Sequence, residues 1–287
     1  MKKPTKTTDE PINITEIELT QAALYLVGET PLVLHSMSLK SRQMLIDPPP
    51  KKNAAERAST QKHEPFEEFR DAAYQFTTDD QPTRLYMPGA AFHSAMASAA
   101  IDMVGAKKAQ IGRLTNVMEE MVCVWGVPKI ICLTVRSADM KRTPDIHTLP
   151  ILPNWCAKFT VEFVASLVKP ASIGNLMGAA GKIIGVGDGR PEKGKLSFGK
   201  FRLVAENDPE FLSIQKFGGR KLQDAALANP AYYNLETERL LTWFKQSGRR
   251  VAKPATEHKP PRVHPAVAAA AEKKRRRGNG DVAAGEE

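Results

Sequence analysis

The side chains best suited to bind a ligand gather in a glycine-rich stretch, residues 185–201. This stretch carries Arg190, Lys193 and Lys195 directly after three alternate glycines, of which Gly187 is the second. Glycine permits positive φ angles and lets a phosphate approach the backbone closely, and nearby cations suit a polyanion. We therefore expect this stretch to bind a phosphate chain. The simpler alternative is a tight helix-to-strand turn with solvated charges.

The histidines and cysteines lack the spacing of a metal site. The six histidines are His35, His63, His93, His147, His258 and His264. No two of them have His-x-x-x-His spacing, and Cys123, Cys132 and Cys156 form no Cys-x-x-Cys pair. We expect no metal, no cofactor, and buried thiols in a reducing cytosol. His35 and His93 would form an acid–base pair only if the fold brought them together, and a satisfied polar role or a strand contact is the simpler interpretation.

Composition and charge indicate a soluble globular protein with an acidic partner. Hydrophobic residues make up 42% and charged residues 25% of the 287, and no run of about 18 apolar residues predicts a membrane span. The formal charge is +9. Residues 248–287 hold ten Lys or Arg against five Asp or Glu, and so supply +5 of that total. Such a tail attracts any polyanion, of which nucleic acid is the commonest.

Hydrophobic periodicity predicts an α+β fold. Alternating or β-branched residues predict strands, and apolar residues at three- and four-residue steps predict helices. The predicted elements are a strand at 14–26, a helix at 90–104, a second helix at 111–120, strands at 129–136 and 155–165, a helix at 173–184 and a strand at 198–204. Without the second helix, this is the ferredoxin-like (RRM-like) βαββαβ order, which covers one face of its sheet with helices and leaves the other open.

Polar stretches divide the chain around this core. We expect a disordered N-terminus (1–12), the ferredoxin-like domain (13–206), a helical C-terminal extension (207–247) and a basic disordered tail (248–287). The domain contains a polar insertion (39–82), which at this length is usually functional or disordered, and a polar connection (137–153). Aromatic residues of the insertion can stack on bases, although a local hydrophobic cluster is commoner. They are Phe66, Phe69, Tyr74 and Phe76.

Three segments, in matching order, resemble the RAMP superfamily, which supplies the backbone subunits of CRISPR effector complexes. Residues 29–36, Glu-Thr-Pro-Leu-Val-Leu-His-Ser, are similar to the family's Pro-Leu turn after its opening strand. Residues 86–95, Tyr-Met-Pro-Gly-Ala-Ala-Phe-His-Ser-Ala, resemble its helix entry, with alanines where serines are common. The stretch 185–201 resembles its glycine-rich loop, with Lys200 in place of a glycine before the final Phe201. The chain is most similar to small members carried in phage and prophage genomes.

The resemblance implies a subunit that oligomerises along one nucleic-acid strand and grips its phosphates without reading bases. The strand contacts carried over in this way are His35, Lys40, Arg42, His93, Ser94, Lys141, Arg142, Gly187, Arg190, Lys193 and Lys195. The connection 137–153 corresponds to the family's protruding thumb. Some members cut RNA with an aspartate after the opening strand, and Asp47 is the acidic residue close to that place, although Asp-Pro is also an ordinary turn.

These observations predict a non-catalytic protein that binds single-stranded nucleic acid, with RNA favoured over DNA, and forms homo-oligomers. Other subunits of a nucleoprotein complex are candidate partners, and a membrane is not. The polar N-terminus is unlike a secretory signal, so we expect a cytoplasmic protein of a bacterial or phage-infected cell. Two alternatives stay open: a ribonuclease that uses Asp47, and a phage protein for protein interaction or single-stranded DNA recombination and annealing.

Overall fold

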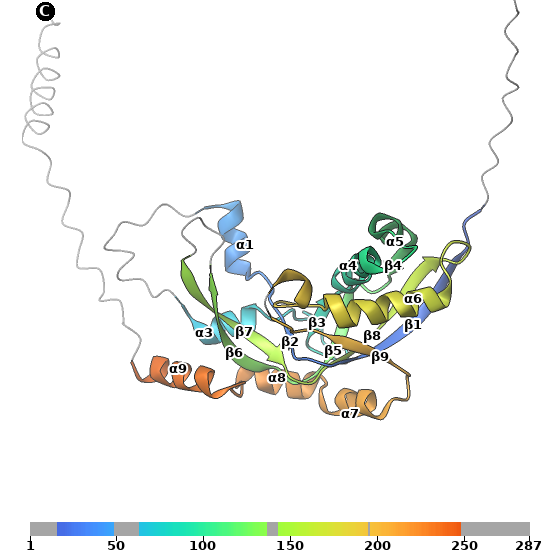
Figure 1. Cartoon of the computed structure of the whole chain (residues 1–287). Coiled ribbons are helices and arrows are strands. Elements are labelled where there is room, and N and C mark those ends of the chain that lie inside the picture. Colours follow the sequence, from blue (N-terminus) through green and yellow to red (C-terminus); the bar gives the residue numbers. More distant parts are fainter. Residues whose placement is uncertain (1–15, 49–62, 137–142, 195, 248–287) are drawn as a thin grey trace, which may run out of the picture.

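The computed structural model describes residues 16–48, 63–136, 143–194 and 196–247 (Figure 1). They form a mixed α+β structure with antiparallel sheets, which confirms the predicted fold class. The tail predicted at 248–287 and the N-terminus predicted at 1–12 lie outside the described residues. Among the residues described, no helix combines the length and the apolar character needed to cross a membrane.

The larger sheet follows the order β3-β5-β8-β1-β9, and β4 pairs separately with β8. Its strands are β1 (Leu19–Gly28), β3 (Tyr86–Pro88), β4 (Thr115–Val117), β5 (Met121–Trp125), β8 (Cys156–Val164) and β9 (Phe201–Val204). The strict alternation predicted around residues 155–165 is the central strand β8, whose buried side chains face the core. Every pairing in this sheet is antiparallel.

Helices α4 (Gly89–Ala99) and α6 (Pro170–Ala179) lie on one side of this sheet (Figure 1). Along the path β5-β8-β1-β9, the chain passes from β1 through α4 to β5, and from β8 through α6 to β9. Each crossover skips one strand, as a βαββαβ core requires. The strand predicted at 129–136 as the second strand of the core lies instead in the second sheet, and β5 takes its place. Strands β3 and β4 are additions to that core, so the predicted six-element order is corrected in both respects.

The second helix predicted at 111–120 was wrong in its C-terminal half. Helix α5 (Lys108–Leu114) ends at Leu114, and β4 follows at once. The side chains of Thr115 and Val117 are buried while Asn116 between them is exposed, and all three pair with β8. Pairing with a neighbouring strand thus overrides a weak local helix preference.

A second sheet has the order β2-β7-β6, from β2 (Leu32–Val33), β6 (Lys129–Arg136) and β7 (Pro144–Leu152). Strand β7 occupies most of the stretch 137–153, so that part of the predicted polar connection is corrected to a strand. The prolines Pro144 and Pro150 concealed it, because proline is normally excluded from central strands. Burial of Leu149 and Ile151 against Val33 explains why the strand forms.

The insertion 39–82 is more ordered than its polarity predicts. It contains helix α1 (Leu39–Ile46) and helix α3 (Pro65–Asp71). Phe69 and Phe76 are 0% and 6% exposed, so the second half of the insertion belongs to the core. Because these two rings pack inward, the interpretation as a local hydrophobic cluster is confirmed for them, and stacking on bases is excluded.

Three C-terminal helices continue the fold beyond β9: α7 (Pro209–Phe217), α8 (Arg220–Ala228) and α9 (Leu235–Gln246). They lie on the side of the molecule opposite α4 and α6 (Figure 1). Phe211 of α7 packs with Val27, Trp125 and Cys156 on the second face of the larger sheet. The expectation of an open sheet face is therefore corrected to a half-open one.

Candidate nucleic-acid interface

The glycine-rich loop is anchored by backbone hydrogen bonds at its base. Four of its glycines have positive φ angles: Gly185 (72°), Gly187 (81°), Gly189 (65°) and Gly199 (69°). The Gly199 amide donates to the Pro31 carbonyl at 2.8 Å, and the Asp188 amide donates to the Val33 carbonyl at 3.0 Å. The loop is thereby clamped onto β2, and its described exposed residues are Glu192, Lys193, Gly194, Leu196 and Ser197.

The predicted cations of this loop differ in their hydrogen bonding and exposure. Arg190 donates from Nε to Glu192 at 3.0 Å and from Nη1 to the Gly187 carbonyl at 3.1 Å, so it is engaged within the loop. Burial favours a protonated Glu192, but hydrogen bonds from Ser98 and Arg190 outweigh it and lower the pKa of that carboxyl. Lys193 is exposed, and Lys195 lies outside the described residues.

The C-terminal turn of α4 lies beside the loop. Lys108 of α5 donates to the Ser98 hydroxyl of α4 at 3.0 Å, and Ser98 also bonds Glu192 of the loop. Ser94 is exposed one helical turn before Ser98, on the same side of α4. Helix α4 and the glycine-rich loop, which are far apart in sequence, are therefore neighbours in space.

A pair of histidines connects the loop with the second sheet. His35 Nδ1 lies 2.8 Å from Asp188 Oδ2, and the ring of His35 meets the ring of His147 edge-on at 5.2 Å. The hydrogen bond from His35 lowers the pKa of Asp188. Burial, reinforced by His35, lowers the pKa of His147. The structure therefore brings His35 to His147, whereas the sequence offered His93 as its partner.

Asp188 and His147 are site residues that sequence reasoning missed. In the structure Asp188 bonds His35. The Nδ1 atom of His147 and the Nε2 atom of His93 are both buried, without a hydrogen-bond partner among the described residues. The only signal for Asp188 was its place between two glycines, and His147 gave none, because its strand was not predicted.

The remaining predicted contacts are spread over α1 and its surroundings. Lys40 and Arg42 are exposed on α1, while Lys141 and Arg142 lie outside the described residues. Asp47 follows α1, is exposed, and has no hydrogen-bond or ion-pair partner for its side chain within the described chain. No group of three acidic, histidine or cysteine side chains in that part of the chain is arranged to hold a metal ion.

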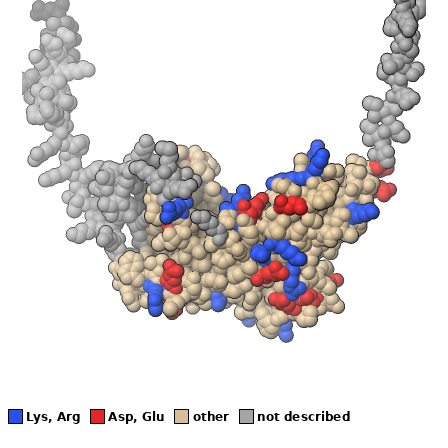
Figure 2. Space-filling model, viewed as in Figure 1, with Lys and Arg blue, Asp and Glu red and all other residues tan. Residues whose placement is uncertain are grey.

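Charge on the visible face is mixed. Figure 2 shows that Lys and Arg are interspersed with Asp and Glu over this side of the molecule. The electrostatic potentials of neighbouring opposite charges cancel at longer distances. Such a surface therefore attracts a polyanion only locally, next to individual Lys or Arg side chains.

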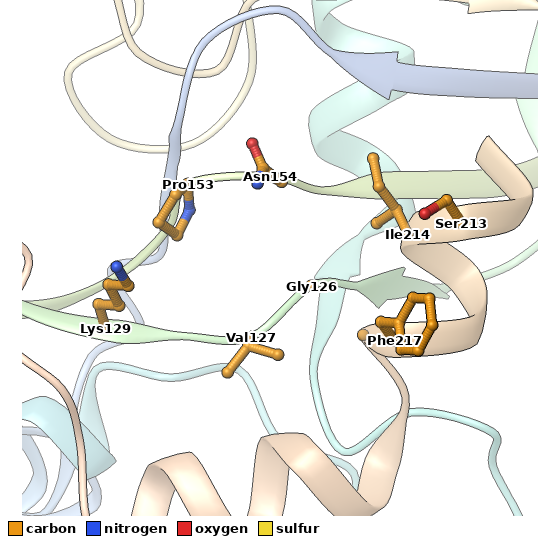
Figure 3. A pocket seen from close by; sticks show the side chains of 9 residues that line it. Gly126, Val127, Lys129, Pro153, Asn154, Ser213, Ile214 and Phe217 are labelled. Carbon is orange, nitrogen blue, oxygen red and sulfur yellow. The ribbon is translucent and has the colours of Figure 1, made fainter. Parts of the chain in front are cut away.

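One hollow of about 280 Å³ lies between the β5–β6 turn, the turn before β8 and α7 (Figure 3). Its side chains include Val127, Pro153, Ile214 and Phe217, and Lys129 is its charged member. Neither a histidine nor a carboxylate is among its lining residues, so these residues do not suit acid–base catalysis.

Comparisons with known proteins find distant structural likenesses. No protein-family model matches this chain, and no curated protein matches its sequence. Among solved structures, it is similar to Cmr6 from Pyrococcus furiosus, with 7% identity over 66% of this chain and 100% of that one, at a TM-score of 0.32. A chain of the Type III-B Cmr-beta bound to cognate target RNA matches at 14% identity over 65% of this chain and 59% of that one, at a TM-score of 0.33. At such low TM-scores, neither likeness establishes a function.

Proposed function

We propose that this chain is a RAMP-like subunit that binds single-stranded nucleic acid through backbone phosphates, RNA in preference to DNA. It forms homo-oligomers along the strand, with other subunits of a nucleoprotein complex as further partners, and has no catalysis of its own. The observation that carries the proposal is the glycine-rich loop, whose base is clamped to β2 while its cationic tip is exposed beside α4.

This geometry suits a flexible, charged strand. A phosphate contact needs donors held in place before the ligand arrives, since ordering a loop on binding costs affinity. Backbone hydrogen bonds to Pro31 and Val33 hold the loop, and Lys193 is presented at its tip. His35 bonds Asp188 of the loop and Ser94 is exposed on α4, so a strand that passes over the loop could contact both.

The preference for RNA and the assembly along a strand follow from the RAMP resemblance. Phosphate contacts alone carry no sequence information, so the proposed protein binds strands of many sequences. The setting in a phage or prophage is part of the same proposal.

The test is charge reversal of the glycine-rich loop in the full chain, with Arg190, Lys193 and Lys195 changed together to Glu. We expect weaker binding to a labelled single-stranded RNA, and a salt slope reduced by ~0.7 for each phosphate that the variant no longer neutralises. A matched control reverses three exposed cations on the opposite helices, Lys216, Lys221 and Arg239.

Fluorescence anisotropy over a salt series measures both quantities. If the loop variant bound RNA as tightly as the parent, the loop would not be the binding site. If only truncation after Gln246 removed binding, the basic tail would account for the affinity.

A further inference from the structure

A second hollow lies on the half-open face of the larger sheet, away from α4 and α6. Its volume is about 440 Å³, within the range of sites that hold small molecules. It is lined from β1, β5, β8 and the turns before β3 and β5. The lining residues are Ala23, Leu24, Tyr25, Gln81, Pro82, Glu119, Met121, Cys123, Trp125, Lys158, Phe159 and Thr160. No residue predicted to bind nucleic acid is among them.

The floor of this hollow is a cross-strand row of side chains. Tyr25 of β1 lies directly opposite Lys158 of β8, and both line the hollow. The ring of Phe211 meets the Tyr25 ring edge-on at 5.5 Å. The tyrosine is therefore braced from α7, which leaves an aromatic surface of defined orientation at the border of the hollow.

The wall of the hollow is the turn at residues 78–82, which Arg220 of α8 holds in place. Arg220 pairs with Asp79 at 2.9 Å and donates to the carbonyls of Gln81 at 2.8 Å and Thr78 at 2.7 Å. Arg84 adds a second contact to Asp79 at 3.2 Å. A wall held by this many charged hydrogen bonds is formed before any ligand arrives.

One cation of the hollow is free to bind an anionic group. Lys158 is exposed and has no carboxylate partner among the residues that the structure describes. The Glu119 carboxylate also lines the hollow, and both of its oxygens accept the Thr160 amide, at 3.0 and 2.8 Å. An aromatic ring, the sulfur atoms of Met121 and Cys123 and a free cation together suit a flat, polarisable and negatively charged molecule.

We propose that this hollow binds one nucleotide of single-stranded nucleic acid, with its base against Tyr25 and its phosphate at Lys158. The class of ligand rests on the proposed function, whereas the site is new, because it lies on the sheet face away from α4. Base–aromatic stacking tolerates any base, which agrees with a strand bound without regard to sequence. A peptide segment of another protein is the competing occupant.

The test is a cysteine footprint of the unmodified protein. Cys123 lines the hollow, and Cys132 is a half-buried thiol of the other sheet. Burial raises the pKa of both thiols, so they are a matched pair for slow alkylation. We expect saturating single-stranded RNA to slow alkylation at Cys123 and to leave Cys132 unchanged, as measured by peptide mass spectrometry.

Substitutions at Tyr25 show whether its ring contributes to RNA affinity by stacking or only packs within the protein. Tyr25→Leu removes the ring and should weaken RNA binding about fivefold or more, whereas Tyr25→Phe keeps the ring and should bind nearly as the parent does. Lys158→Gln should reduce the salt slope by ~0.7. Circular dichroism of each variant identifies any that fails to fold.

The outcomes distinguish this inference from the proposed function. If RNA left Cys123 alkylation unchanged while charge reversal of the glycine-rich loop abolished binding, the hollow would be excluded and the proposed function would stand. Protection of Cys123 that survived that charge reversal would support the hollow and count against the loop. If neither RNA nor a nucleoside monophosphate protected Cys123, and only a protein partner did, the inference would be overturned.

Discussion

The glycine-rich loop and helix α1 were both expected to contact a strand, but they are built in opposite ways. The loop is held by its own backbone, through hydrogen bonds to Pro31 and Val33 and through four positive φ angles. Helix α1 buries none of its residues, and its Leu45 and Ile46 are 72% and 87% exposed. Substitutions at the anchoring residues of the loop therefore change the structure first, whereas substitutions in α1 can act only on what binds to it.

The largest expected effect is that of Gly199→Ala. Gly199 has φ +69°, and a Cβ there would overlap the backbone of Val186, so the loop cannot keep its shape. We expect a loss of about 3 kcal/mol in the free energy of unfolding, measured by urea denaturation.

Gly194→Ala is the matched control within the same loop. Gly194 has an extended backbone, and a Cβ there would have nothing within 4 Å. Its unfolding free energy should stay within about 0.5 kcal/mol of the parent value. Equal losses for the two variants would show that the loop is not clamped.

A smaller loss of unfolding free energy is expected at the hydrogen bond between Thr30 and the end of the loop. The Thr30 hydroxyl accepts a hydrogen bond from the Lys200 amide at 2.9 Å. Thr30→Val removes that acceptor and should cost about 1 kcal/mol of unfolding free energy. Thr20→Val, at an exposed position of β1, should cost less in the same urea titration, and a reversed order would argue against the anchor.

The bond between His35 and Asp188 predicts a pH dependence. Because the pKa of Asp188 is lowered in the folded state, its contribution is present above the unfolded value of 3.8 and is lost as pH falls through the folded pKa. Asp188→Asn should therefore be less stable than the parent near neutral pH, and the difference should shrink below pH 3.8. Urea midpoints over a pH series measure this, with the exposed Asp102→Asn as control. A difference independent of pH would contradict the assignment.

The smallest effect is expected at α1. Changing Leu45 and Ile46 together to Ser should leave the unfolding free energy within about 0.5 kcal/mol of the parent value, because neither side chain is buried. A clear loss in thermal or urea unfolding would mean that α1 packs against part of this chain. The comparison between loop and helix would then fail.

The sequence predicted elements well where one short segment carried a complete pattern. Strand β8 alternates strictly, and β6 is rich in β-branched residues, so both were found. Strand β7 was missed, because its prolines mimic a loop while Leu149 and Ile151 are buried by a partner that is distant in sequence. The packing of α7 against the sheet was missed for the same reason, because the residues around Phe211 do not indicate which strands it will contact.

By itself, the sequence determined the α+β class, the central strands and the glycine-rich loop, because the period of apolar residues and the freedom of glycine are local properties. Only the tertiary structure decided that His35 meets His147 and Asp188, and that Tyr25, Lys158 and Cys123 line one hollow. Those groupings depend on which strands pair and in what register. Sheet register is decided by packing over the whole core, and no short stretch of residues contains it.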